Sequence, residues 1–134
     1  RFDVIIIDST DAIGPVAVLF SPVVYENCRR CLTPDGILTT QNGVPFIQGE
    51  ELVASARAFD ALFAHPRFYF AAVPRYMVGA MAFGCASQAT DAGIIATSEL
   101  QQRLVQRTLK LAYYSPVIHG AAFAMPPYLQ ALTA

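Results

Sequence analysis

The chain opens with a compact run of apolar, β-branched residues. This run covers residues 2–8, Phe-Asp-Val-Ile-Ile-Ile-Asp, and a polar loop follows it. Such a run predicts a strand that is buried on both faces of a parallel sheet. A strand of this kind usually has neighbours on both edges, yet this one starts at the first residue. We therefore expect the chain to be a fragment of a longer domain.

A helix and a second strand are expected next. Ser21 is a suitable N-cap and Pro22 suits the first helical position, which predicts a helix to about Leu32. The sequence Thr-Pro-Asp-Gly at 33–36 is a turn signal, and residues 36–41 are apolar enough for a strand. Strand, helix and strand in this order predict a right-handed crossover between parallel strands.

From residue 42 onward, the sequence predicts further helices and an antiparallel pair of strands. The expected elements, in order, are a loop over 42–49, a helix over 50–63, two strands over 68–73 and 80–87, a helix capped by Thr97 or Ser98 and running to about residue 110, and a tail over 113–132 whose short helix is broken by Pro126-Pro127. The two strands should form an antiparallel hairpin. The fold class is α/β, with parallel strands that end in this hairpin, and it resembles the Rossmann-like sheet of S-adenosylmethionine-dependent transferases. Fold alone does not name a reaction.

Composition and charge narrow the function classes. The 134 residues suffice for one core, and 54% are hydrophobic while 14% are charged, with a mean hydropathy of +0.42. Every apolar run is too short for a membrane span, so we expect a soluble protein. A net charge of −1 with scattered basic residues argues against nucleic acid as a partner. Three cysteines, an odd number, make a disulfide framework improbable and fit a reducing cytoplasm.

Two carboxylates follow the first strand, where open α/β sheets bind ligands. Asp8 and Asp11 lie three positions apart in the sequence Asp-Ser-Thr-Asp. Two acids in such a loop can hold a cationic amine and remove its proton. The alternative is that one of them only caps the loop or the following helix.

Four segments carry a more specific pattern. Residues 8–15, Asp-Ser-Thr-Asp-Ala-Ile-Gly-Pro, precede Leu-Phe at 19–20 and Tyr25; the others are Gln-Asn-Gly at 41–43, Val-Pro-Arg-Tyr-Met-Val-Gly at 73–79, and Tyr-Tyr-Ser-Pro-Val-Ile-His-Gly-Ala-Ala-Phe-Ala-Met-Pro at 113–126. In this order they resemble the spermidine synthase (polyamine aminopropyltransferase) family. The departures are Ala12 and Met77, where the family commonly has Pro, and Ser115 for Asn. Loop rigidity and diamine preference are the properties that these departures affect.

The resemblance implies roles for individual residues. Asp8 would be the catalytic general base, while Asp11, Gln41 and Tyr76 would bind the amine. The residues implied to contact the adenine of the cosubstrate are Pro15, Val16 and Leu19. The implied reaction moves an aminopropyl group from decarboxylated S-adenosylmethionine to putrescine, giving spermidine and methylthioadenosine. No tightly bound cofactor and no metal are implied.

The resemblance also carries expectations about the rest of the protein. Residues 1–134 would form the C-terminal half of the catalytic domain, lacking the N-terminal β domain and the first half of the sheet, and would be inactive alone. Family members are commonly dimers or tetramers, so a homo-oligomer is expected. Cys28 and Cys31 form a C-x-x-C inside a predicted helix without a second pair, so core packing is favoured over zinc. His119 matches the family's last segment, which suggests a structural role.

Two other functions stay open at this stage. A methyltransferase that uses S-adenosylmethionine could share the sheet, although amino-methylating enzymes often carry Asn/Asp-Pro-Pro-aromatic where this chain has Asp-Ser-Thr-Asp. A noncatalytic relative with the same fold is the other alternative. The joint presence of Asp8, Asp11, Gln41 and Tyr76 argues against it.

Overall fold

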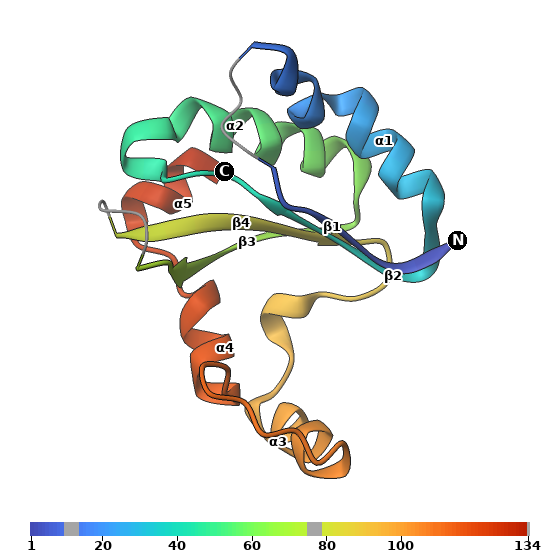
Figure 1. Cartoon of the computed structure of the whole chain (residues 1–134), viewed down its shortest axis with the longest axis vertical. Helices are drawn as coiled ribbons and strands as arrows, with labels where there is room; N and C mark the ends of the chain where they lie inside the picture. Colours follow the sequence, from blue (N-terminus) through green and yellow to red (C-terminus); the bar gives the residue numbers. More distant parts are fainter. Residues whose placement is uncertain (10–13, 75–78, 134) are drawn as a thin grey trace.

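The fold is that of a computed structural model, which describes residues 1–9, 14–74 and 79–133 (Figure 1). Its elements are β1 (Phe2–Ile7), η1 (Gly14–Phe20), α1 (Pro22–Cys31), β2 (Leu32–Gln41), α2 (Pro45–Leu62), β3 (His65–Ala72), β4 (Ala80–Ser87), η2 (Ala92–Ile94), α3 (Thr97–Gln106), α4 (Pro116–Phe123) and α5 (Pro127–Thr133). Within the part of the chain that is described, no helix combines the length and apolar character needed to cross a membrane.

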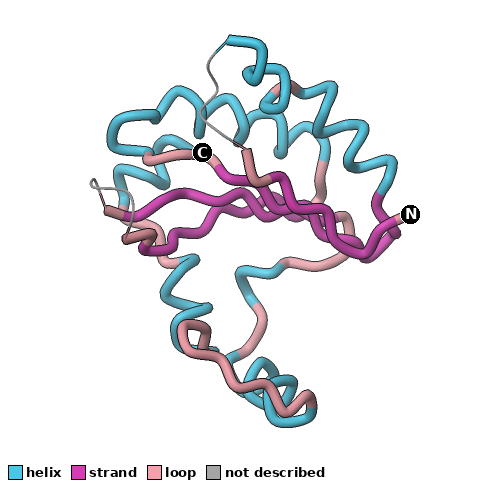
Figure 2. Tube along the Cα trace, in the orientation of Figure 1, coloured by secondary structure: helices cyan, strands magenta, loops and turns pink. Residues whose placement is uncertain are grey.

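The described strands form one four-stranded sheet in the order β1-β2-β4-β3. β1 and β2 are parallel, whereas β4 is antiparallel to both of its neighbours. The parallel pair and the antiparallel hairpin confirm the fold class predicted from the sequence. Figure 2 shows the strands as a single twisted layer with helices on both sides.

Helices cover the two faces of the sheet unequally (Figure 1). α1, α2 and α5 lie over one face, while α4 lies on the other face against β3, with α3 beyond it. The main core lies under α2, where Phe59 is fully buried. Its ring contacts Tyr25 edge-on at 4.9 Å and stacks on Phe68 at 5.6 Å between centroids. This core holds α1 and α2 against the sheet and therefore fixes the strand ends beside them.

The predicted helix boundaries are partly correct. Ser21 caps α1, since its hydroxyl accepts a hydrogen bond from the backbone N–H of Val24 at 3.4 Å. α2 begins at Pro45 and not at residue 50, because the side chain of Gln48 accepts the backbone N–H of Val44 at 2.8 Å and allows a first turn before a kink at Gln48. α3 begins after Ala96, which offers no capping side chain, so the predicted cap at 97 or 98 is wrong.

The two parallel strands also differ from expectation. β2 starts at Leu32, and the expected turn at 33–36 is instead an irregularity in the pairing, which steps from Phe2↔Leu32 to Val4↔Ile37. β1 is not buried on both faces: Phe2, Val4 and Ile6 are 60%, 54% and 70% exposed. The reason is its position at the edge of the sheet, where no described element covers that face.

Candidate active site

Strand register brings two predicted site residues to the same edge of the sheet. The parallel pairing of β1 with β2 ends at Ile7↔Thr40. Asp8 is the next residue after Ile7, and Gln41 is the next residue after Thr40. The two residues therefore lie next to each other at the carboxyl end of the parallel pair. This is the edge at which open α/β sheets bind ligands.

The side chain of Gln41 belongs to the sheet face that is opposite to α1 and α2. Neighbouring residues of a strand point to opposite faces, and Thr40 is buried, at 2% exposed, on the α2 side. On the Gln41 side, register continues through Phe83 of β4 to Tyr69 of β3. The rings of Phe83 and Tyr69 stack at 5.3 Å between centroids. Gln41, which is 8% exposed, therefore has Phe83 beside it on one side, with Tyr69 beyond Phe83.

Tyr69 is itself restrained. Its hydroxyl lies 3.4 Å from Oγ1 of Thr39, and the Thr39 hydroxyl donates to the carbonyl oxygen of Gly84 at 2.9 Å. Burial raises the pKa of Tyr69, and the Thr39 hydrogen bond opposes that shift in part. The phenol is consequently neutral at physiological pH and acts as a fixed aromatic surface with one polar tip.

The start of β4 lies at the same edge. Asn42 donates its backbone N–H to the carbonyl oxygen of Ala82, and Ala82 returns its N–H to the carbonyl oxygen of Gly43, each at 2.9 Å. The beginning of β4 therefore lies beside the end of β2, where Gln41 pairs with Phe83. Tyr76 of the loop between β3 and β4 and Asp11 of the loop after β1, with the departures Ala12 and Met77, lie outside the described residues.

The segment predicted to contact the adenine forms η1. Pro15 and Leu19 are exposed, Leu19 by 37%, while Val16 is half-buried. η1 contacts α1 and α2, which hold it on their side of the sheet. The exposed side chains of Pro15 and Leu19 make the outer surface of η1 apolar.

A buried polar cluster lies on the α2 side of the sheet, opposite to the side chain of Gln41. It was not predicted from the sequence. Oδ1 of Asn42 accepts from Oγ1 of Thr40 at 2.7 Å and from the backbone N–H of Gly84 at 2.8 Å. Nδ2 of Asn42 donates to Oγ of Ser55 at 2.8 Å, and Ser55 bonds the hydroxyl of Tyr25 at 3.0 Å. We call these five residues the strand-end clamp. Asn42 beside Gln41 was noted only as a match to the family, although a polar residue after a buried strand is a signal for such a cluster.

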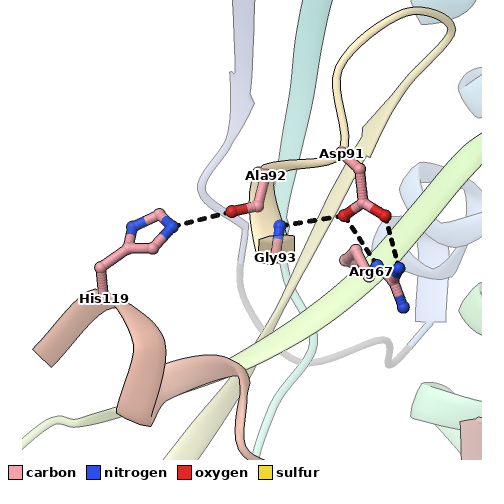
Figure 3. Close-up of polar contacts among 5 residues, drawn as sticks. All are labelled: Arg67, Asp91, Ala92, Gly93 and His119. Atoms are coloured by element: carbon pink, nitrogen blue, oxygen red, sulfur yellow. Dashed lines mark hydrogen bonds and ion pairs between the residues drawn. The ribbon is translucent and has the colours of Figure 1, made fainter. Parts of the chain in front are cut away.

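A second polar group joins β3 to α4 (Figure 3). Asp91 accepts two hydrogen bonds from the guanidinium of Arg67 and one from the backbone N–H of Gly93. The Arg67 hydrogen bonds hold the pKa of the Asp91 carboxyl below its usual value. On the other side of η2, Nε2 of His119 lies 2.8 Å from the carbonyl oxygen of Ala92 and therefore donates to it. η2 is thus held from both sides, in agreement with a structural role for His119.

The last of the four family-like segments, residues 113–126, covers the sheet face to which Gln41 points. Ser115 caps α4 by accepting the backbone N–H of Ile118 at 3.2 Å, a bond that Asn could also make at that position. Nδ1 of His119 accepts the hydroxyl of Tyr114 at 3.2 Å. A cavity of about 300 Å³, lined mainly by apolar and aromatic side chains, lies between α4 and the sheet and is bordered by Thr39 and Tyr69.

The cysteines of the C-x-x-C behave differently from each other. Cys28 lies against the core, and burial raises the pKa of its thiol. Cys31 is exposed, so the prediction of core packing is wrong for this residue. Among the described residues, no group of three or more His, Cys, Asp or Glu side chains is placed to hold a metal ion.

Comparisons with known proteins give this geometry a context. A family model described as the spermine/spermidine synthase domain matches residues 1–94. A polyamine aminopropyltransferase of Ruegeria sp. (strain TM1040) is 48% identical over 132 residues, which is 98% of this chain and 46% of that one. A protein of the same name from Escherichia coli (strain K12 / DH10B) is 47% identical over 129 residues, covering 96% of this chain and 45% of the relative.

Solved structures agree with the sequence relatives. Spermidine synthase from Thermotoga maritima superposes with a TM-score of 0.83 at 28% identity, covering 99% of this chain and 44% of that one. A spermidine synthase in complex with the transition state analogue AdoDATO gives a TM-score of 0.86 at 27% identity, with 99% and 45% covered. The chain spans about half the length of the relatives that it matches. Because the family model matches residues 1–94, which is more than half of the chain, the chain belongs to the spermine/spermidine synthase family.

Proposed function

We propose that the full-length protein is an aminopropyltransferase that moves the aminopropyl group of decarboxylated S-adenosylmethionine to putrescine. The observation that supports the proposal is the register of β1 and β2, because Asp8 and Gln41 follow the last pair at the edge where open α/β sheets bind ligands. The names of the relatives support this reaction over a methyl transfer.

The proposed chemistry is a direct displacement at carbon. The amine nitrogen forms a bond to the propyl carbon next to the sulfonium, while the carbon–sulfur bond breaks and its electron pair stays on sulfur. Methylthioadenosine leaves as a neutral thioether and requires no acid. Because the attack needs the nitrogen lone pair, one proton of the bound ammonium must first pass to a base, and the product nitrogen remains a secondary ammonium.

Asp8 is the proposed base. An alkylamine resembles lysine, whose pKa is about 10.4, so only about one molecule in 2,500 is neutral at pH 7. The carboxylate of Asp8 is exposed at the edge of the sheet and can approach a bound ammonium group. It would attract the cation, accept its proton and leave the nitrogen lone pair directed at the propyl carbon.

The other predicted residues complete the site in this proposal. Gln41 would accept a hydrogen bond from the amine through its amide oxygen, with Asp11 adding negative charge and Tyr76 aligning the amine. The proposed contacts to the adenine come from η1 and are Pro15, Val16 and Leu19. Because two bound molecules react, alignment supplies a large share of the rate.

We also propose an arrangement for the whole protein. Residues 1–134 act as the C-terminal half of a Rossmann-like catalytic domain, a proposal supported by the coverage of less than half of each relative. The remaining half would supply most of the cosubstrate site, so residues 1–134 alone would be inactive. A cytoplasmic homo-oligomer, dimer or tetramer, completes the proposal, and size-exclusion chromatography with light scattering measures its stoichiometry.

The test of the reaction uses the full-length protein with decarboxylated S-adenosylmethionine and putrescine. Spermidine and methylthioadenosine are quantified for the wild type, for Asp8→Asn and for the control Asp3→Asn. Asp3 lies at the other end of β1 from Asp8, where it accepts a hydrogen bond from Thr33 that asparagine can still accept. Loss of a general base typically lowers turnover by about 10²- to 10⁴-fold.

The outcomes separate the possibilities. Both products in equal amounts, lost with Asp8→Asn and retained with Asp3→Asn, support aminopropyl transfer with Asp8 as the base. A folded wild type that makes neither product from putrescine or from another diamine refutes the proposed function. Equal activity of Asp8→Asn and the wild type refutes the role of Asp8 alone.

A further inference from the structure

We propose that Asn42 is a positioning residue of the amine site, which acts by holding the backbone of Gln41 through the strand-end clamp. The inference rests on the proposed function, because it takes Gln41 to be a contact of the amine. It adds Asn42, Ser55 and Tyr25 to the residues on which the reaction depends, although their side chains are buried away from the strand edge.

The orientation of the Asn42 amide follows from its partners. The backbone N–H of Gly84 can only donate, so the atom that faces it at 2.8 Å is the oxygen Oδ1. Nδ2 must then point to Ser55, where it donates at 2.8 Å. Asn42 is completely buried, and every described buried side-chain nitrogen or oxygen has a hydrogen-bond partner. A fully satisfied polar cluster of this kind has one low-energy arrangement.

The clamp connects four elements at one point. Asn42 reaches β4 through Gly84 and α2 through Ser55, and Ser55 passes the connection to Tyr25 of α1 at 3.0 Å. Thr40, the residue before Gln41, donates to the same Oδ1 at 2.7 Å. The end of β2 is therefore fixed to α1 and α2.

Gln41 lies between two clamped residues. Thr40 and Asn42 direct their side chains to the α2 side of the sheet, so Gln41 points to the opposite face. The backbone of Asn42 is further held by its N–H bond to Ala82 at 2.9 Å. With both neighbours fixed, Gln41 is presented in one backbone position, and only its own side-chain torsions remain free.

This arrangement matters because the proposed reaction depends on alignment. A misplacement of about 1 Å at a site of this kind can lower the rate about 10²-fold. Ser55→Ala removes the acceptor of the Asn42 Nδ2–H and leaves a buried donor unpaired, which favours a shift of the strand end. Tyr25→Phe removes only the outermost hydroxyl of the clamp and should have a smaller effect in the same direction.

The experiment compares these variants with a matched control in the full-length protein. Leu38→Val removes a buried methylene from the same strand and the same face, without touching a hydrogen bond. Steady-state kinetics with putrescine and with decarboxylated S-adenosylmethionine are measured separately. Hydrogen–deuterium exchange of the amides of Asn42, Ala82 and Gly84 reports on the strand end independently of activity.

Positioning predicts a selective result. Ser55→Ala should raise the KM for putrescine about tenfold, leave the KM for decarboxylated S-adenosylmethionine within about twofold, and accelerate exchange at the three amides. Tyr25→Phe should follow with smaller changes, and Leu38→Val should show neither effect. Equal changes in both KM values, or the same changes in Leu38→Val at a similar melting temperature, would overturn the proposal.

The inference and the proposed function fail in different ways. An active wild type with unaltered putrescine kinetics in Ser55→Ala refutes the inference and leaves the function standing. A wild type without transfer activity refutes the function and, with it, the assignment of Gln41 as an amine contact. In that second case the exchange data still decide whether the clamp holds the strand end.

Discussion

Gly84→Ala is the sharpest test of the packing behind the strand end. A methyl group built on Gly84 would lie 2.6 Å from Oγ1 of Thr40, 2.6 Å from Cε2 of Phe59 and 3.0 Å from Oδ1 of Asn42. Carbon atoms in contact normally lie about 3.5–4.0 Å apart, so these neighbours must move. Overpacking of a core typically costs about 1–3 kcal/mol, and weakening one buried hydrogen bond adds about 1 kcal/mol. We therefore expect the free energy of unfolding to fall by about 2–4 kcal/mol.

Urea unfolding followed by circular dichroism measures this change in the full-length protein. The matched control is Gly120→Ala on α4, where a methyl group meets no atom within 4 Å. That change should leave stability unaltered or raise it by up to about 1 kcal/mol, because alanine favours the helix. If Gly84→Ala unfolds within about 0.5 kcal/mol of the wild type with the same denaturant dependence, the reasoning about this close approach is wrong.

Three further predictions concern the core and the β3–η2 connection. Asp91→Asn should lower the free energy of unfolding by about 0.5–1 kcal/mol, as expected for an ion pair with the half-exposed Arg67. Because the pKa of Asp91 is lowered from 3.8, its contribution is present above that value and is lost as pH falls further, so the difference between wild type and Asp91→Asn should shrink below about pH 4; denaturation curves that keep the difference constant to pH 2 would contradict this. Burial raises the pKa of the Cys85 thiol to about 11, so iodoacetamide at pH 8 should label Cys85 only after unfolding, as mass spectrometry can show, and rapid labelling of the native protein would exclude such burial. Phe59→Ala should lower the free energy of unfolding by about 3–5 kcal/mol in urea titrations, since its ring is fully buried among aromatic side chains, and a loss below about 1 kcal/mol would place it outside the core.

Local chemistry made several elements predictable. The apolar run at 2–7, the Ser21-Pro22 start of α1 and the hairpin strands are determined by residue types within a few positions. The first turn of α2 was missed because it depends on a hydrogen bond from the backbone of Val44 to the side chain of Gln48. The expectation that β1 is buried on both faces was wrong within this chain, because periodicity reports the apolar character of a strand and not what covers it.

In the candidate site, too, some features could be predicted from the sequence and others could not. Asp8 and Gln41 were selected from motifs, and their catalytic and binding roles stay predictions. Their shared position at one edge is consistent with the fold class, since parallel strands end on the same side of a sheet. Asp11 and Tyr76 also stay predictions, as they lie outside the described residues.

The sequence by itself determined the fold class, the family and the residue types at the end of each strand. Only the tertiary structure decided that Asn42, the residue after β2, meets Ser55 of α2, Tyr25 of α1 and Gly84 of β4 behind Gln41. The physical reason is that strand and helix patterns depend on near neighbours, whereas a buried amide is satisfied by whatever donors and acceptors packing brings to it. Those partners come from three different elements, and no local pattern specifies their meeting.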